Sequence, residues 1–371
     1  MYWDYKQPVR VKFGKGMIGC LCEEIEALGL KCGLLVTSPS FVKRGKADEV
    51  CQMSGGAIKH VFSGVSANPD VSECDACANL LREKKCDFVV ALGGGSVMDC
   101  AKAAATFCLS DKPSTAYLGT GEPIPQAHLP IIAMPTTAGT GSEITSVSVL
   151  SDHARGVKAP MSSDGFFPTL AIVDPELTYS VPPHLTACTG MDVLCHAIES
   201  YWSVNHQPVC SALSVHAARL VFDNLRAAVN ESDAKARCAM AEASVTAGLA
   251  FALPKTTSAH ACSYPLTNRL GIAHGEACGL TIAHFTRFNA SHGCERVQTL
   301  AHELGFADAN ALADAIDALK ADTGLRTDLK DFALTDELFN QLATESMHPN
   351  MKNNPVAVSL ADVKAMYRSM M

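Results

Sequence analysis

The sequence predicts an α/β nucleotide-binding domain with a mainly parallel sheet, followed by an all-helical domain. Up to about residue 174, short apolar runs alternate with amphipathic stretches. Several of these runs are continuously apolar, as strands buried on both faces of a parallel sheet are. Beyond that point such runs disappear, and Ala, Leu and His become common. The 371 residues also exceed the length that one hydrophobic core usually serves, so we expect two domains.

Five runs have the apolar, β-branched composition of strands: VRVKF (9–13), CGLLVT (32–37), FVVALGG (88–94), PIIAMPT (130–136) and TLAIVD (169–174). Helical patterns separate some of them, at residues 17–29 and 71–85. This alternation is typical of a doubly wound α/β domain. Pro182 and Pro183 form a natural break, so we place the domains at residues 1–180 and 181–371.

Charge and composition exclude several classes of protein. The net charge is −8 and no run of Lys or Arg occurs, which argues against nucleic-acid binding and against a basic membrane patch. The N-terminus lacks the features of a signal peptide, and no stretch approaches the ~18 apolar residues of a membrane span. We therefore expect a cytoplasmic protein whose 16 cysteines are reduced. The CxxC pair Cys74/Cys77 has no second pair that would indicate a zinc site.

Two glycine segments are candidates for binding a dinucleotide. Gly14, Gly16 and Gly19 spell GxGxxG, but Ser38 stands where an acid should hold the ribose, so we interpret them as turn residues. The segment GGGS (93–96) follows an apolar run and begins a helical stretch. Its backbone N–H groups and the helix N-terminus would favour a pyrophosphate, with a flexible turn as the alternative.

A second loop, PTTAGTGSE (135–143), follows the next expected strand. Ligands of open α/β sheets bind outside the carboxyl ends of strands, so two such loops support a cofactor site more than either alone.

A metal site is suggested by one carboxylate and three imidazoles. Asp192 and His196 are four residues apart, which on a helix places them on one face, and His260 and His274 follow later. This donor set suits Zn²⁺ or Fe²⁺ and leaves a position for a substrate oxygen, which such an ion polarises. In a chain with 13 His, however, the spacing alone favours chance over a metal site.

Taken together, these segments resemble the iron-containing (group III) alcohol dehydrogenases, in that family's order and spacing and over essentially the whole chain. The segments are ALGGGSVMDCAK (91–102), MPTTAGTGSE (134–143), TGMDVLCHAIESY (189–201) and SAHACSYPLTNRLGIAHGEA (258–277). The resemblance implies hydride transfer between NADH and a small aldehyde, with metal and substrate in a cleft between the domains. It also implies a homo-oligomer, by family a dimer.

The resemblance further implies which residues bind the metal and the cofactor. The metal ligands correspond to Asp192, His196, His260 and His274. The nucleotide contacts correspond to Asn68, Gly94, Gly95, Ser96, Thr136, Thr137, Thr140, Thr145 and Lys158. Many members have Asp, which selects NAD, at the position of Ser38. Ser38 lacks the carboxylate that would repel the 2′-phosphate of NADP(H), and the basic residues Lys43 and Arg44 lie nearby. We therefore expect NAD(H) to be preferred over NADP(H) without strict selection.

The sequence departs from many relatives in the expected substrate region. Tyr264 replaces a His that faces the substrate, and the segment NNPV (353–356) lacks an Arg found after the Pro in many relatives. The segment around Tyr264 resembles a branch that includes reductases of sulfoacetaldehyde and of phosphonoacetaldehyde. We expect Tyr264 to orient the substrate or to join a proton relay, with an aromatic wall as the alternative. Phe251 and Lys255 are further candidate substrate residues.

An anionic substrate would make charge-assisted hydrogen bonds with Lys255, although a solvated loop lysine is the alternative. Other readings are a reductase of uncharged aldehydes such as lactaldehyde or butanal, and a non-catalytic nucleotide- and metal-binding sensor. Glycerol-1-phosphate dehydrogenases and dehydroquinate synthases share the two-domain plan. The Asp192/His196 pair, together with the GGGS and TTAGT loops, argues against them.

Overall fold

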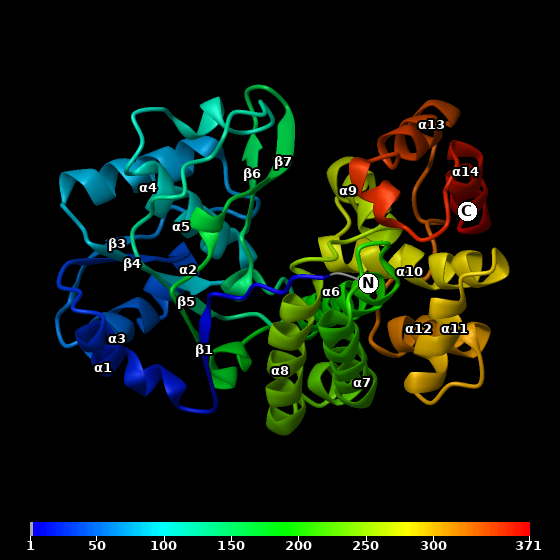
Figure 1. The fold of residues 1–371 in the computed structure, drawn as a ribbon, viewed down its shortest axis with the longest axis horizontal. Coiled ribbons are helices and arrows are strands. Elements are labelled where there is room, and N and C mark those ends of the chain that lie inside the picture. The colour runs from blue at the N-terminus through cyan, green and yellow to red at the C-terminus, as the bar shows by residue number, and fades with distance from the viewer. Residues whose placement is uncertain (1–2) are drawn as a thin grey trace. The chain divides into compact units, whose positions relative to one another are not determined.

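The computed structural model describes residues 3–371, which divide into two compact units (Figure 1). The N-terminal unit comprises residues 6–137 and 141–178. The C-terminal unit comprises residues 179–371, the loop residues 138–140 and the described residues up to Tyr5. Within residues 3–371, no helix combines the length and the apolar character that crossing a membrane requires.

A six-stranded parallel sheet forms the centre of the N-terminal unit, in the order β1-β8-β5-β4-β2-β3. Its strands are β1 (Arg10–Phe13), β2 (Gly33–Val36), β3 (Ile58–Phe62), β4 (Phe88–Gly93), β5 (Ile131–Pro135) and β8 (Leu170–Val173). Strands β2, β4, β5 and β8 are buried at every residue, because apolar clusters cover both faces of the sheet. The predicted parallel α/β domain and its five expected strands are therefore confirmed.

Helices cover both faces of this sheet (Figure 1). The helices α4 (Val71–Glu83) and α5 (Gly95–Phe107) pack on one face, and α1 (Leu21–Ala27) and α3 (Lys46–Met53) pack on the other. The short α2 (Pro39–Lys43) follows β2. The helix expected over 17–29 begins as the 3-10 turn η1 (Met17–Cys20) before it becomes α1. Further 3-10 turns are η2 (Ser114–Ala116), η3 (Ser142–Ile144), η4 (Asp164–Phe166) and η5 (Pro175–Thr178).

Three strands were not predicted. The edge strand β3 has the sequence IKHVF, in which Lys59 and Val61 are exposed, so it has no continuous apolar run. The strands β6 (Val147–Asp152) and β7 (Val157–Ser162) form an antiparallel hairpin with several Ser residues. In all three strands a smaller fraction of the residues is buried than in the strands in the middle of the sheet.

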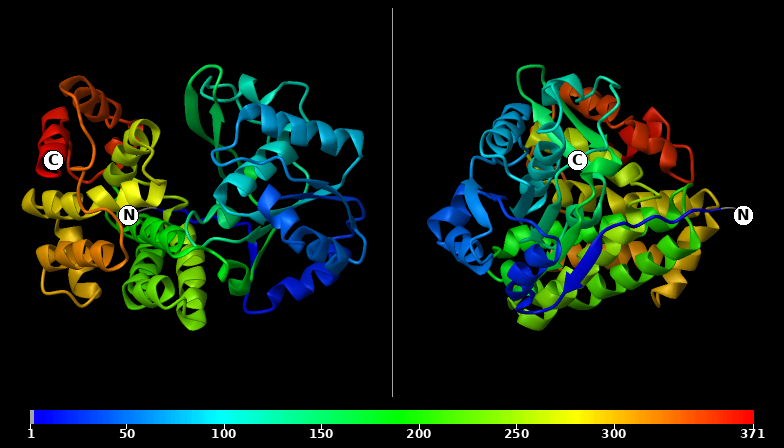
Figure 2. Two further views of the ribbon diagram at one scale, coloured as in Figure 1. Left: turned by 180° about the vertical axis from the view of Figure 1, so that it is seen from behind. Right: turned by 60° about the vertical axis from the view of Figure 1, so that its left-hand side comes forward.

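The C-terminal unit is helical, as predicted, and α7 and α8 lie side by side within it (Figures 1 and 2). One apolar core joins its helices, and nearly every residue of α6 from Thr186 onward is buried. Its helices are α6 (Pro183–Trp202), α7 (Pro208–Asn230), α8 (Ala234–Phe251), α9 (Ser258–Leu270), α10 (His274–Ser291), α11 (Glu295–Glu303), α12 (Ala309–Asp322), α13 (Asp336–Glu345), η6 (Pro349–Asn353) and α14 (Leu360–Ser369).

Candidate active site

The four side chains expected to bind a metal converge in the C-terminal unit. Asp192 and His196 lie one turn apart on α6, whereas His260 lies on α9 and His274 begins α10. The Asp192 Oδ1 atom is 3.9 Å from Nε2 of His196 and 3.4 Å from Nε2 of His260. It is 3.8 Å from Nε2 of His274. We call these four residues the ligand cluster.

The ligand cluster has the properties of a cation site. Among the described residues, Oδ1 of Asp192 and Nε2 of His260 are buried without a hydrogen-bond partner. Buried polar atoms are rarely left unpaired, because each loses its water without compensation. A carboxylate oxygen surrounded by imidazole nitrogens at these distances can be satisfied by one divalent ion between them. The residues present therefore fit a Zn²⁺ or Fe²⁺ ion.

The pKa values in the ligand cluster also indicate a site for positive charge. Burial opposes ionisation of Asp192, but the neighbouring imidazoles outweigh it and hold the pKa of Asp192 below its usual range. Burial lowers the pKa of His196 to about 4. Burial also disfavours a charged His260, yet Cys278, Glu199 and Asp192 raise the pKa of His260 well above its ordinary value. The cluster thus attracts positive charge, which either a proton or a metal ion supplies.

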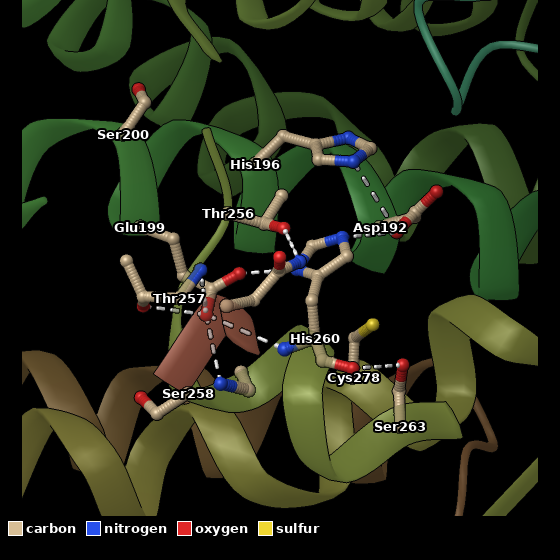
Figure 3. A network of polar contacts seen from close by, with 12 residues as sticks. Asp192, His196, Glu199, Ser200, Thr256, Thr257, Ser258, His260, Ser263 and Cys278 are labelled. Atoms are coloured by element: carbon tan, nitrogen blue, oxygen red, sulfur yellow. Dashed lines mark hydrogen bonds and ion pairs between the residues drawn. The ribbon is translucent and has the colours of Figure 1, made fainter. Parts of the chain in front are cut away.

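Glu199 orients His260, a role that the sequence analysis missed. Its Oε1 accepts hydrogen bonds from the N–H of Thr257 at 3.1 Å, the hydroxyl of Thr257 at 2.7 Å and the N–H of Ala259 at 2.8 Å. Its Oε2 faces Nδ1 of His260, and Figure 3 shows the His260 ring between Glu199 and Asp192. A carboxylate at Nδ1 leaves the proton there and the Nε2 lone pair free for a metal.

A sequence signal for Glu199 exists. Asp192, His196 and Glu199 are spaced four and three residues apart, which places all three on one face of a helix. A carboxylate at that third position indicates a partner that orients a metal ligand.

Cys278 is a second residue that the sequence analysis missed. It lies one turn after His274 on α10, and its Sγ is 3.9 Å from Nε2 of His274. Its sulfur lies within 4.8 Å of candidate ligand atoms of Asp192, His260 and His274. The cluster therefore offers a soft sulfur donor beside the oxygen and nitrogen donors.

Two aromatic side chains flank the ligand cluster. The Phe251 ring stacks on His196, with ring centres 4.1 Å apart and planes within 8°. The Tyr264 ring is nearly parallel to that of His274, at 6.1 Å between centres. Burial raises the pKa of Tyr264 to about 12, so its phenol keeps its proton at neutral pH.

A chain of polar contacts leads from Tyr264 to the segment that contains Lys255. The Asn350 amide donates to Oη of Tyr264 at 3.3 Å and to Oγ1 of Thr256 at 2.9 Å. The Asn353 amide donates to the carbonyl of Thr256 at 2.9 Å. Lys255 has a φ of 64°, a left-handed conformation that a residue with a Cβ rarely adopts. Among the described residues, none accepts a hydrogen bond from its ammonium group, whose pKa is lowered by burial.

In the N-terminal unit, several of the expected cofactor residues lie beyond the carboxyl ends of β2, β4 and β5, which are neighbours in the sheet. Gly94 precedes α5 and Gly95 is its first residue. A Cβ atom on Gly94 would lie 3.1 Å from Oγ1 of Thr137, so a larger side chain has little room there. Thr136 follows β5 directly, and Ser38 precedes α2 after β2.

Three further expected cofactor residues are joined by hydrogen bonds. The N–H of Asn68, a residue with a φ of 56°, donates to Oγ of Ser96 at 3.3 Å. The Lys158 ammonium donates to Oδ1 of Asn68 at 3.0 Å. Thr145 accepts a hydrogen bond from the buried Lys102 at 3.4 Å. Thr140 belongs to the C-terminal unit.

The glycines of the GxGxxG segment and the CxxC pair, which we interpreted as structural, lie in a turn and in the apolar core. Gly14 and Gly16 follow the edge strand β1, and Gly16 has a φ of 71° in the turn that begins η1. Cys74 and Cys77 are fully buried in the apolar core between α4, α5 and the sheet.

Comparisons with known proteins agree with the resemblance. Residues 8–175 match the model of iron-containing alcohol dehydrogenases, and residues 186–371 match the C-terminal model of the Fe-containing alcohol dehydrogenase family. The solved structure of sulfoacetaldehyde reductase from Bifidobacterium kashiwanohense in complex with NAD⁺ is 55% identical to this chain. That match covers 100% of this chain and 99% of the other, with a TM-score of 0.98.

Curated relatives extend the comparison. Long-chain-alcohol dehydrogenase 1 of Geobacillus thermodenitrificans is 35% identical, over 96% of this chain and 93% of its own. The sulfoacetaldehyde reductase of Bilophila wadsworthia is 30% identical, over 96% of each chain. Because the family models match both halves of the sequence and the relatives align along nearly all of it, the chain belongs to the iron-containing alcohol dehydrogenase family.

Proposed function

We propose that this protein is a metal-dependent, NAD(H)-linked reductase of a small aldehyde with an anionic head group, such as sulfoacetaldehyde, whose reduction gives isethionate. The observation that carries the substrate class is the partly buried ammonium of Lys255, which lacks an acceptor among the described residues, next to the polar contacts that begin at Tyr264. The names of two relatives, both sulfoacetaldehyde reductases, support the same class.

The ligand cluster would hold the metal, with Asp192 supplying the charged oxygen and three imidazoles the nitrogens. When bound, a divalent ion supplies Lewis-acid polarisation of a carbonyl oxygen, and a reduced nicotinamide supplies hydride. Glu199 keeps the His260 ring in the orientation that presents Nε2. The Phe251 ring restricts the movement of His196 by stacking on it.

Tyr264 would position the substrate rather than act as a base. Its raised pKa keeps the phenol protonated, so it can donate a hydrogen bond to a substrate oxygen. The Asn350 amide already donates to this phenol oxygen, which leaves the O–H proton to point elsewhere. We propose that the substrate oxygen receives its proton through a relay that includes this O–H group.

Lys255 would hold the anionic head group. A partly buried ammonium without a partner costs free energy, and so does a left-handed conformation in a residue with a Cβ. A sulfonate or phosphonate would relieve the first cost through charge-assisted hydrogen bonds with the ammonium and neighbouring hydroxyl groups. The hydroxyl of Thr256 is the nearest such group in sequence.

Several finer points complete the proposal. We favour NAD(H) over NADP(H) and take Zn²⁺ and Fe²⁺ as the candidate ions. We also propose a cytoplasmic homodimer with domains at residues 1–180 and 181–371.

The test compares kcat/KM for sulfoacetaldehyde, phosphonoacetaldehyde, propanal and lactaldehyde. We expect a strong preference for the anionic aldehydes, because a neutral analogue leaves polar groups of the site unpaired. Lys255→Met should lower kcat/KM for the anionic substrates by about 10- to 100-fold, since a hydrogen bond to a charged group contributes ~1.5–3 kcal/mol. The same variant should change the value for propanal little.

Three outcomes would count against all or part of the proposal. If propanal or lactaldehyde matches the anionic aldehydes in the wild type, the protein reduces uncharged aldehydes instead. If the anionic preference survives Lys255→Met, another group holds the anion. No turnover of any aldehyde, together with retained cofactor and metal binding, would favour a sensor.

A further inference from the structure

Two thiols and one imidazole meet at the edge of the sheet opposite the cofactor loops. Cys32 directly precedes β2, Cys86 lies two residues before β4, and His60 lies in β3. These three strands are neighbours in the order β3-β2-β4. Because all strands are parallel, the amino-terminal ends of β2 and β4 lie at the edge away from Gly94 and Ser38.

The three side chains have the separations of metal ligands. One ligand atom from each of Cys32, His60 and Cys86 lies within 4.8 Å of the other two. A tetrahedral zinc ion with ordinary Zn–S and Zn–N bonds holds such atoms roughly 3.5–3.8 Å apart. Side-chain rotations that move these ligand atoms by about 1 Å would therefore bring them to the separations of tetrahedral zinc coordination.

The backbone around both cysteines is tied together by Asp87. Its carboxylate accepts from the N–H of Cys32 at 2.8 Å and from the N–H of Lys31 at 3.0 Å. Its own N–H donates to the carbonyl of Cys32 at 2.9 Å. These bonds fix the ends of β2 and β4 next to each other, so the two thiols are held close before any ion binds.

His60 points to the same side of the sheet as the two cysteines. Side chains alternate along a strand, so His60 and Phe62 share a face of β3. Phe62 and Cys32 both pack against the apolar cluster that contains Cys86. Cys86 is buried, whereas Cys32 and His60 are partly exposed, which leaves an entry path for an ion.

We propose that Cys32, His60 and Cys86 form a second metal site, which binds a thiophilic cation such as Zn²⁺ through two thiolates and one imidazole. Three protein ligands leave one position for water or a small ligand, as in open zinc sites. This site is separate from the ligand cluster of the C-terminal unit, and it does not depend on the proposed reaction.

The consequence would be a zinc-dependent stabilisation of the N-terminal unit. An ion that binds only the folded chain raises the free energy of unfolding in proportion to the logarithm of its concentration. Zinc binds thiolates rather than thiols, so binding at this site would release protons. Zinc affinity at this site should therefore fall as the pH is lowered.

The test uses reduced full-length protein, equilibrium dialysis against buffered Zn²⁺ and elemental analysis. The wild type should bind about two Zn²⁺ per chain, and Cys86→Ser and Cys32→Ser should each bind about one. Cys51→Ser is the matched control, because Cys51 is a partly buried thiol of the same unit outside the cluster. It should bind as much zinc as the wild type.

A second readout identifies the ligands. Titration with Cd²⁺ should give the ultraviolet charge-transfer absorption of cadmium thiolates in the wild type and in Cys51→Ser. The increment should shrink in Cys32→Ser and Cys86→Ser, and His60→Gln should weaken binding without abolishing the absorption. The proposal is overturned if folded Cys32→Ser and Cys86→Ser, checked by their melting temperatures, bind as much zinc as the control.

Discussion

Replacing Glu199 by Gln should weaken metal binding, although it changes neither a metal ligand nor the size of the side chain. The Oε1 position receives four hydrogen bonds, from Thr257, Ala259 and the N–H of His260, so the Gln oxygen will remain there. The amide nitrogen then takes the place of Oε2 and points a donor at Nδ1 of His260. To accept this bond, His260 must move its proton to Nε2, which is the atom that faces Asp192.

The size of the effect follows from this change of tautomer. With a proton on Nε2, His260 cannot donate a lone pair to the metal until the favoured hydrogen bond is broken. Loss of such an orienting partner usually costs 10- to 100-fold in metal affinity, or ~1.4–2.7 kcal/mol. Glu199→Gln should therefore bind zinc about 10- to 100-fold more weakly, with an NADH dissociation constant close to that of the wild type.

Competition with a fluorescent chelator measures the zinc affinity, and fluorescence titration measures NADH binding. Glu24→Gln is the matched control, because Glu24 is a buried carboxylate of the N-terminal unit that pairs with Arg10 and Lys12. It should lower the melting temperature while leaving zinc affinity at the ligand cluster unchanged. An unaltered zinc affinity in Glu199→Gln would refute the orienting role of this carboxylate.

Three other predictions concern the cofactor and the metal. Gly94→Val should raise the NADH dissociation constant at least about tenfold, because even a Cβ would lie 3.1 Å from Oγ1 of Thr137; an unchanged titration would mean that the glycine serves only the turn. Ser38→Asp should weaken NADPH far more than NADH, since a carboxylate repels a 2′-phosphate; equal effects on both would place Ser38 away from the ribose. Finally, the pKa of His260 without a metal is raised, so its proton stabilises the apoprotein at low pH, and this stabilisation is lost as the pH rises through the raised pKa. The rise in melting temperature on adding zinc should accordingly grow from acid to alkaline pH, and a constant or falling increment would contradict this.

The elements that could be predicted from sequence are those whose burial produces a local apolar pattern, such as a continuous apolar run. The strands β4 and β5 are buried at every residue, and their continuous apolar runs identified them. The edge strand β3 could not be found in this way, because Lys59 faces solvent and its pairing with β2 depends on residues distant in sequence. The strands β6 and β7 could not be found either. Much of this hairpin is only partly buried, so its sequence contains several polar residues and no continuous apolar run.

The residues of the site also divide into those that a local sequence pattern predicts and those that depend on contacts between distant segments. The spacing of Asp192 and His196 is a helical signal, but their approach to His260 requires that α9 pack against α6, which no local pattern records. Glu199 and Cys278 each have a helical spacing from an expected ligand, but both also approach His260 on α9, and that approach is visible only in the structure. Family resemblance supplied the ligand set, whereas the structure supplied the residue that orients it.

The most direct test of the central claim is the rate of NADH oxidation with sulfoacetaldehyde, before and after removal of the metal. Chelated wild-type enzyme should lose nearly all turnover, and addition of Zn²⁺, or of Fe²⁺ without oxygen, should restore it. His260→Ala should still bind NADH but regain little activity with either ion. Full turnover by metal-free protein, or full restoration of His260→Ala, would contradict a metal-dependent reduction at the ligand cluster.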